Sequence, residues 1–453
     1  MLQAEYNNRH MRIMVFPGET MLGALQRIQV NMDAPCGGNG TCGRCEVMVY
    51  GIGKVKACQF CKPGMYEVTI PKQTEFDAVT SAQDHSPKRG TEGLRNVNAD
   101  IRGAAVDIGT TTVAVRIFAD GNVKEQKFTN PQRVYGADVM SRIRAAVEGN
   151  GEKLQKLIAE SLQKAVGNAS PVIISANMTM QHLLEGLSCA GLGAAPFQPV
   201  TLKLHELDGS MACMKKGSRL VFLPGISTFV GADIVSGIYA CGMTEREKIS
   251  LFLDLGTNGE MAIGNSRHLF VASASAGPAF EGSELAQHIY GSGIMKALRQ
   301  MLTEGVMDET GLLADPFFEE GYPVGKENAI RMSQDDIRNI QMAKAAIHAG
   351  IQILLKTCGI HPVDVDKVYL AGGMGYYLNP EDAIAIGLLP KEFEGKIQAV
   401  GNSSLDGAEC YLANPKDAGV KMEQIADMAE EVVLAEHPLF QTFYMDGMNF
   451  PAK

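Results

Sequence analysis

Residues 35–45 read PCGGNGTCGRC, and a further cysteine, Cys58, follows after a short apolar segment. Cys36, Cys42 and Cys45 have the spacing C-x5-C-x2-C, and the residues between them are rich in glycine. Glycine readily adopts positive φ angles, which lets a backbone curve around an inorganic centre and direct its N–H groups at sulfur. A [2Fe–2S] cluster takes four thiolates, commonly three in one loop and a fourth downstream. The stretch therefore predicts a [2Fe–2S] cluster held by these four cysteines.

Zinc is the main alternative for this stretch. Cys42-x2-Cys45 and Cys58-x2-Cys61 resemble the two halves of a zinc ribbon. A zinc site of this kind leaves Cys36 unused and gives the glycines no purpose, whereas the iron–sulfur interpretation leaves only Cys61 unused. The glycine-rich loop therefore favours iron.

The segments around the cysteines have the order of a small β-grasp ferredoxin. Strands are expected over 9–15, 46–50 and 65–70, and a helix over 21–30 with Thr20 as its N-cap. Residues 73–102 are polar and lack an apolar period, which is typical of a linker. We therefore expect a [2Fe–2S] ferredoxin-like domain over 1–72, followed by a linker.

Composition excludes several classes of protein. The net charge of −10 argues against a nucleic-acid partner, which needs a basic surface. No run of about 18 apolar residues predicts a membrane span, and the polar N-terminus does not resemble a signal peptide. Ten cysteines then indicate metal ligands and buried thiols of a cytoplasmic protein rather than disulfides.

Two similar strand–turn–strand patterns follow the linker. Residues 104–118 contain Asp107 before a Gly-Thr turn, and residues 251–263 repeat the pattern with Asp254. The repetition predicts an internal duplication, and the alternation of strands and helices in the C-terminal half predicts an α/β or mixed sheet. Helices are expected over 151–167, 177–187, 334–357 and 421–436, the third capped by Ser333, and strands over 171–175, 220–224 and 368–371.

The two turns are suited to a nucleotide. Glycine and threonine at such a turn offer N–H and hydroxyl groups to phosphate oxygens, and an aspartate at a strand end can hold Mg²⁺ directly or through water. The glycines of residues 371–375 (AGGMG) follow a predicted strand and would let adenosine approach the backbone. The order of the three motifs predicts ATP binding without a Walker P-loop, because the sequence has no G-x-x-x-x-G-K-[ST].

At this point the chain resembles a known family. The three motifs look like phosphate-1, phosphate-2 and adenosine of the acetate and sugar kinase, Hsp70 and actin (ASKHA) superfamily. Further segments resemble ATP-dependent reductive activators of corrinoid proteins, which join a [2Fe–2S] domain to an ASKHA-like domain. These segments are Asn130–Arg142, Asn177–Leu184, Leu223–Asp233, Ala276–Gly282 and Val400–Ala408.

The resemblance implies a repair reaction. The chain would reduce the inactive Co(II) of a corrinoid protein to Co(I) in a methyltransferase system, using its cluster, ATP, Mg²⁺ and a low-potential electron donor. The ASKHA-like domain would span 103–453, with lobes over about 103–248 and 249–453. A homodimer is suggested by resemblance alone. An ASKHA small-molecule kinase with a zinc-binding accessory domain, and an electron carrier without ATP coupling, stand as alternatives.

Residue roles follow from the motifs and the resemblance. Asp107 and Asp254 would serve Mg²⁺ and the attacking water, and Glu260 is either a base that orients water or a solvated strand residue. Asp138 and Asp233 are site residues or helix N-caps, and His182 is more readily explained as a core residue than as a ligand. Glu281 is a further candidate. The residues expected to hold phosphates are Gly109, Thr110, Thr111, Gly256, Thr257 and Asn258, and those expected at adenosine are Gly372, Gly373 and Gly375.

Overall fold

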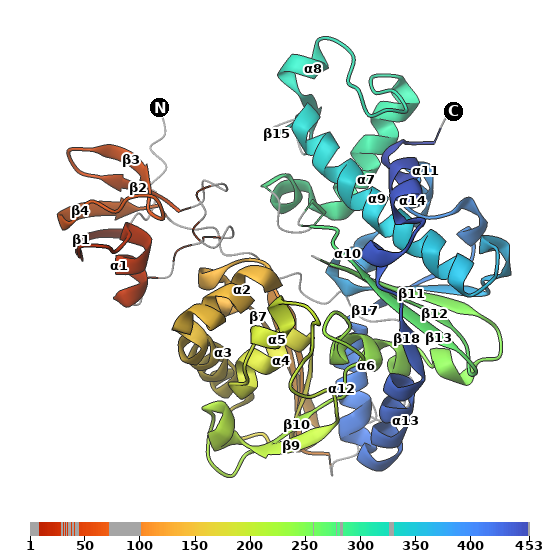
Figure 1. Ribbon diagram of the computed structural model, residues 1–453, viewed down its shortest axis with the longest axis horizontal. Coiled ribbons are helices and arrows are strands. Elements are labelled where there is room, and N and C mark those ends of the chain that lie inside the picture. Colours follow the sequence, from red (N-terminus) through yellow and green to blue (C-terminus); the bar gives the residue numbers. More distant parts are fainter. Residues whose placement is uncertain are drawn as a thin grey trace.

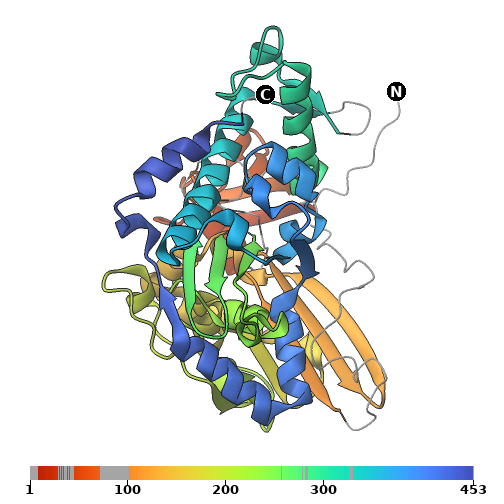
Figure 2. The same cartoon turned by 90° about the vertical axis from the view of Figure 1, so that its right-hand side faces the viewer.

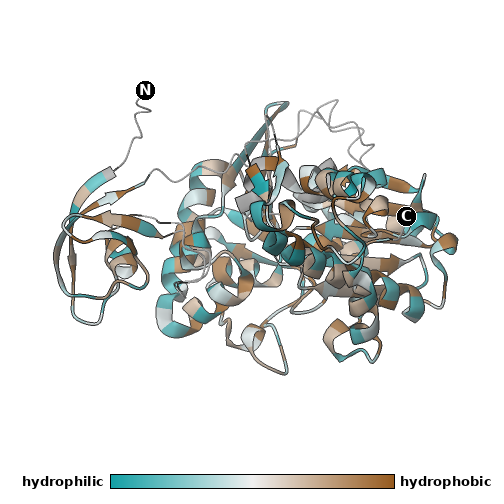
Figure 3. Cartoon of the chain, turned by 90° about the horizontal axis from the view of Figure 1, so that it is seen from above, coloured by the Kyte–Doolittle hydropathy of each residue, from teal (hydrophilic) through white to brown (hydrophobic). Residues whose placement is uncertain are grey.

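A computed structural model of the chain shows a small N-terminal unit beside a larger part built on two six-stranded sheets (Figure 1). Seen from above and coloured by hydropathy, the two parts lie next to each other and each contains apolar segments (Figure 3). The residues that the structure describes are 9–28, 30, 32, 34, 38, 40, 45–71, 101–256, 258–277, 279–280, 284–325 and 330–451.

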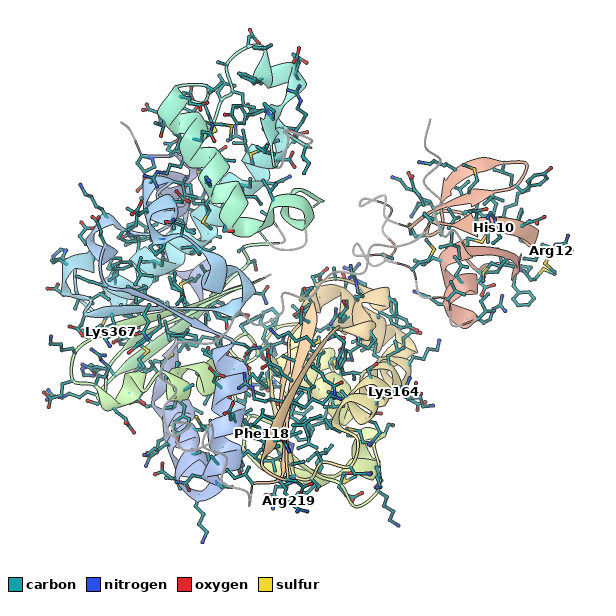
Figure 4. The ribbon with its side chains drawn as sticks, turned by 180° about the vertical axis from the view of Figure 1, so that it is seen from behind. His10, Arg12, Phe118, Lys164, Arg219 and Lys367 are labelled. Atoms are coloured by element: carbon teal, nitrogen blue, oxygen red, sulfur yellow. The ribbon has the colours of Figure 1, made fainter. Side chains whose placement is uncertain are left out.

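The N-terminal unit, residues 9–71, is a four-stranded antiparallel sheet with one helix on it. Its strands have the order β1-β4-β2-β3, with bounds β1 Arg9–Val15, β2 Glu46–Val49, β3 Gly53–Lys56 and β4 Gly64–Ile70. Helix α1, Met21–Arg27, begins at the predicted cap Thr20, whose hydroxyl accepts from the Gly23 N–H. The helix ends three residues before its predicted end, and β3 was not predicted. Figure 4 shows Arg12 of β1 on the side of the unit that faces away from the larger part.

The first large sheet has the strand order β7-β6-β5-β8-β10-β9. Its strands are β5 Gly103–Ile108, β6 Thr112–Ala119, β7 Asn122–Thr129, β8 Val172–Ala176, β9 His205–Asp208 and β10 Arg219–Phe222. One face is covered by apolar residues of helices α3, Gly151–Val166, and α4, Met178–Glu185. Shorter elements join them: η1 Pro131–Tyr135, α2 Val139–Ala145, η2 Ala146–Asn150, α5 Ala190–Gly193 and η3 Gly209–Ala212.

The second large sheet repeats this arrangement. Its order is β17-β16-β11-β12-β13-β18, with bounds β11 Ser250–Leu255, β12 Gly259–Gly264, β13 Leu269–Ala274, β16 Lys367–Ala371, β17 Ile397–Gly401 and β18 Ala429–Glu431. In both sheets three consecutive antiparallel strands are followed by two parallel ones: β8 pairs with β5 and β10 with β8 in the first sheet, and β16 pairs with β11 and β17 with β16 in the second. The predicted duplication is therefore present in the strand topology.

Two helices lie between the sheets and connect them. Helix α6, Ala232–Ala240, precedes β11, and helix α12, Ser403–Ala413, follows β17. Together with α13, Pro415–Met428, they share one apolar core with residues from both sheets, including Ile173, Val221, Phe252 and Tyr369. Figure 2 shows α12 (blue) beside the orange strands of the first sheet. Helix α12 thus packs on β5 and β8, although it comes from the C-terminal part of the chain.

The outer face of the second sheet carries the long helices α7, Glu284–Glu304, and α9, Gln334–Thr357. Helix α9 has the predicted bounds, and Ser333 forms the predicted cap in a capping box with Asp336. The last predicted helix was wrong in its bounds, because α13 ends at Met428 and residues 429–431 form β18 against β13. The remaining elements are β14 Tyr322–Val324, β15 Ile330–Met332, α8 Phe317–Glu320, α10 Gly372–Tyr377, α11 Pro380–Ala385, α14 Phe440–Met448 and the single-turn helices η4 Met243–Glu245, η6 Pro362–Asp364, η7 Lys391–Phe393 and η8 Leu434–Glu436. Among the described residues, no helix has the length and apolar character needed to cross a membrane.

Candidate functional site

The two Asp-Gly-Thr patterns follow corresponding strands of the two sheets. We call residues 109–111 the first turn, and we call Gly256 and Asn258, which flank a residue outside the described part of the chain, the second turn. In the first, the N–H of Gly109 donates to the carbonyl of Thr112, and in the second, the N–H of Gly256 donates to the carbonyl of Asn258. Asp107 lies one residue before the end of β5 and Asp254 one residue before the end of β11. Each aspartate is therefore placed beside its turn by the strand that carries it.

Asp107 is held by the first residues of α12. Its carboxylate oxygens accept hydrogen bonds from the Asn402 side-chain amide at 2.8 Å and from the Ser404 hydroxyl at 2.7 Å. The Ser404 oxygen lies 2.9 Å from that of Ser175, the residue opposite Asp107 on β8. Burial raises the pKa of Asp107, while these two hydrogen bonds and the nearby charge of Lys127 oppose the rise. The contact joins the first sheet to a helix that leaves the second sheet.

Asp254 lies against the glycine motif that was predicted to bind adenosine. A Cβ atom on Gly372 would lie 2.5 Å from the Asp254 carboxylate and 2.8 Å from the Leu255 carbonyl, and Gly372 has a φ of +81°. Only glycine fits such a position without displacing its neighbours. The motif does not form an open turn, because helix α10 begins at Gly372 and includes Gly373 and Gly375.

A group of acidic side chains connects the two halves of the site. Glu260 faces Asp254 across β11 and β12, and its carboxylate accepts from the Asn258 side chain at 3.1 Å. Burial, together with the negative charges of Asp233 and Asp254, raises the pKa of Glu260 well above its usual range. Burial and the charge of Asp107 raise the pKa of Asp233 to about 7. Carboxylates that disfavour one another's ionisation in this way are typical of a site that binds a cation or transfers protons.

The structure separates several of the predicted alternatives. Glu260 is buried, so it is not a solvated strand residue. Asp138 is the N-cap of α2 and accepts from the Ser141 N–H at 2.8 Å, whereas the N-cap of α6 is Gly231 and Asp233 lies in the first turn of that helix. His182 is fully buried with both ring nitrogens hydrogen-bonded to backbone, which confirms its role as a core residue.

The first turn has further contacts of its own. The Thr110 hydroxyl accepts from the Asn177 side chain at 3.2 Å, and Asn177 is the N-cap of α4. Gly231 approaches so closely that a Cβ atom on it would lie 2.6 Å from the Asn177 Cα. The elements that follow β8 and β10 therefore meet at this turn. Thr257 of the second turn and Glu281 lie outside the described residues.

Part of the predicted cluster loop lies within the described residues. Cys45 and Cys58 are buried, and the N–H of Ala57 donates to the carbonyl of Cys45, so both thiols lie in one region. Gly38 and Gly40 have positive φ angles, as predicted, and their carbonyls accept from the side chains of Gln59 and Lys56 respectively.

Gly38 lies beside Cys58, because a Cβ atom on Gly38 would be 3.8 Å from the Cys58 Cβ. Cys36 and Cys42 lie outside the described residues. Within the described part of the chain, no three metal-ligating side chains gather, although Cys45, Cys58 and Cys61 all belong to it. Cys61 is exposed, unlike the other two.

Several residues of the site were not identified from the sequence. Asn402 and Ser404 lie in the segment Val400–Ala408, which was noted only because it resembles corrinoid reductive activators. Asn402 is the N-cap of α12, and an asparagine directly after an apolar strand is the sequence signal for such a cap. Arg116 on β6 is buried and pairs with Asp406 and Glu409 on α12 and with Glu125. This cluster fastens α12 to the first sheet and so holds the residues that contact Asp107.

Comparison with protein families gives matches over the whole larger part. Residues 102–246 match the RACo middle region, and residues 248–288 and 282–453 match the C-terminal domain of RACo, the ASKHA domain. This chain belongs to the RACo family of corrinoid reductive activators. The ASKHA assignment agrees with the duplicated sheets and with the turns that follow their corresponding strands.

Individual relatives of this RACo-family chain agree with that assignment. The corrinoid activation enzyme RamQ of Eubacterium limosum is 29% identical over 423 residues, which cover 77% of this chain and 70% of that protein. The [Co(II) methylated amine-specific corrinoid protein] reductase of Methanosarcina barkeri is 22% identical over 51% of this chain and 52% of its own length. The solved structure of a reductive activator for corrinoid, iron–sulfur protein shares the fold, with a TM-score of 0.70, 24% identity and 96% of each chain covered.

Proposed function

We propose that this protein reduces the Co(II) of a corrinoid protein to Co(I) by one electron and couples that step to ATP. The observation that carries the proposal is the pair of turns after corresponding strands, each with its aspartate. Asp107 and Asp254 are connected electrostatically through Asp233 and Glu260. Membership of the RACo family supports the same reaction, as do the names of two relatives, the corrinoid activation enzyme RamQ and the Co(II) corrinoid protein reductase.

The nucleotide would lie between the two turns. Thr110 and Thr111 of the first turn, and Gly256, Thr257 and Asn258 of the second, would hold the phosphates. Asp107 and Asp254 would hold Mg²⁺, which supplies positive charge to the phosphate oxygens. The donor set fits this ion, because the charge of Asp107 raises the pKa of Asp233 and the charge of Asp254 raises the pKa of Glu260, and a bound cation would relieve this repulsion. Glu260 would orient or deprotonate water, since it is buried beside Asp254.

The electron would come from a [2Fe–2S] cluster in a ferredoxin-like domain over residues 1–72. Cys36, Cys42, Cys45 and Cys58 would be its ligands, and the cluster supplies a one-electron carrier near roughly −400 mV in plant-type proteins. The buried Cys45 and Cys58 and the positive φ angles of Gly38 and Gly40 support this set. A low-potential donor would reload the cluster.

ATP is needed because the reduction of Co(II) is uphill from an ordinary ferredoxin. Each ~59 mV of unfavourable difference costs a factor of ten in a one-electron equilibrium. A nucleotide shifts such an equilibrium only if it binds two states of the protein with different affinity. Helices α6 and α12 pack between the two sheets. The start of α12 holds Asp107, and Asp233 at the start of α6 acts on Glu260. These two helices are therefore the part of the protein that can distinguish nucleotide states.

An anaerobic assay tests the proposal. The full-length protein is mixed with a Co(II) corrinoid protein and a low-potential reductant, with and without Mg-ATP, and the Co(I) absorption band is followed. We expect Co(I) only with ATP, and none with Asp107→Ala. A coloured protein that forms Co(I) equally well without ATP would be an electron carrier, and a colourless zinc protein that phosphorylates a small molecule would be a kinase.

A further inference from the structure

The backbone carbonyls of the first turn are hydrogen-bonded by a single segment of the chain, Asn130–Arg142. All three of its carbonyl oxygens accept hydrogen bonds: Gly109 from the Asn130 side chain at 2.9 Å, Thr110 from the Arg142 guanidinium at 2.6 Å, and Thr111 from the Asn130 N–H at 2.8 Å. Asn130 and Arg142 are both fully buried. The two side chains therefore set the conformation of the turn without reaching its outer surface.

Arg142 is an unusual side chain for such a position. Its other donors go to the Gly136 carbonyl at 3.0 Å and to the Met180 sulfur at 3.0 Å. Within the described part of the chain no carboxylate forms an ion pair with it. Asp138 acts on its charge from a longer distance, but both Asp138 oxygens bind Ser141. Burying a charge without a close counter-charge costs free energy, so a positive charge here needs an explanation.

We propose that Arg142 is the positioning residue of the first turn and that its buried positive charge favours the polyphosphate of a nucleotide bound there. This inference rests on the proposed nucleotide site and assigns a specific role within it. Arg142 acts through the Thr110 carbonyl, so it holds the turn in a conformation suited to phosphate and adds positive potential from beneath. The charge stays unpaired inside the protein because its counter-charge is the ligand.

The role is consistent with the properties of the side chain. Burial lowers the pKa of Arg142 to about 9, which leaves it charged at neutral pH. Its planar guanidinium can donate in three directions at once, to two carbonyls and a sulfur, which a lysine ammonium cannot reproduce with the same geometry.

Calorimetric binding of ATP, ADP and adenosine to the full-length protein tests the proposal. Arg142→Met keeps much of the side-chain volume and removes the charge. We expect ATP to bind about 10- to 100-fold more weakly, the range for loss of one charged hydrogen bond. ADP should lose less, and adenosine should bind within about twofold of the wild type. Arg142→Lys should recover part of the ATP affinity because it restores the charge.

Gln132→Leu is the matched control. Gln132 is equally buried on the same segment, but its side chain donates to the Leu154 carbonyl and not to the turn. Its removal should leave the ratio of ATP to adenosine affinity unchanged.

The proposal is overturned if Arg142→Met binds ATP like the wild type, or if ATP and adenosine lose affinity in parallel. If Arg142→Met does not fold, Arg142→Gln, which also removes the charge, replaces it. A loss confined to the phosphorylated ligands supports the role, and unchanged ATP affinity overturns it. A wild-type protein that binds no ATP would refute the proposed nucleotide site itself, which is a distinguishable result.

Discussion

Substitution of Gly372 by alanine tests whether Asp254 and the glycine motif belong to one site. The added Cβ atom would lie 2.5 Å from an Asp254 oxygen and 2.8 Å from the Leu255 carbonyl, well inside the ~3.5–4 Å of ordinary packing. The carbonyl belongs to β11 and cannot withdraw without breaking the strand, so the carboxylate must move instead. We therefore expect Gly372→Ala to displace Asp254 from its position beside the second turn.

The size of the effect can be separated into two parts. A positive φ angle costs a residue with a Cβ atom about 1–2 kcal/mol, and overpacking adds a further ~1–3 kcal/mol. Gly395 is a matched control, because its φ is +74° and a Cβ atom on it would meet nothing within 4 Å. Gly395→Ala should therefore show the first cost alone, and Gly372→Ala both.

The assay is Mg-ATP binding together with denaturant unfolding of the wild type and both variants. We expect at least a tenfold loss of ATP affinity in Gly372→Ala, equivalent to about 1.4 kcal/mol, and near wild-type affinity in Gly395→Ala. Equal ATP affinities for the two variants would refute the placement of Asp254 in the site. If Gly372→Ala is partly unfolded, the unfolding curve will show it. The ATP affinities of the two variants are then compared for the folded fraction alone.

Three further predictions follow from charges and thiols. The pKa of Asp233 is raised to about 7, so the folded state holds a proton that the unfolded state loses near pH 4. In a pH series of denaturant titrations without Mg²⁺, the unfolding free energy should therefore fall between about pH 4 and pH 7. Asp233→Asn should flatten this slope. Arg116→Met should destabilise the protein by about 3–5 kcal/mol because it leaves buried carboxylates unpaired, whereas Arg219→Met, which removes an exposed ion pair, should cost at most about 1 kcal/mol; equal losses would contradict the role of the buried cluster. Cys58→Ser should abolish or strongly reduce iron content and visible absorption and Cys61→Ser should not, and the reverse result would exclude the proposed ligand set.

Local sequence signals predicted much of the fold. Ser333 and the apolar period after it gave the bounds of α9, and Thr20 marked the start of α1. The two Asp-Gly-Thr patterns predicted both turns and the duplication, because hairpin chemistry depends on adjacent residues. The end of the last helix was missed, because the amphipathic pattern was extended to residue 436 whereas residues 429–431 pair with β13. Tertiary pairing of this kind overrides local propensity.

The site itself depends on contacts that no local pattern contains. Ser404 lies 297 residues from Asp107 in the chain, yet its hydroxyl is one of the two side-chain donors that hold that carboxylate. The contact arises because the duplication places α6 and α12 at equivalent positions after β10 and β17, so each helix begins near the turn of a sheet. Asp233 at the start of α6 raises the pKa of Glu260 beside the second turn, just as the start of α12 serves Asp107 at the first. A change in the angle between the two sheets would therefore alter the surroundings of Asp107 and Asp254 together. A protein needs this property if bound nucleotide is to control the relative positions of its two sheets.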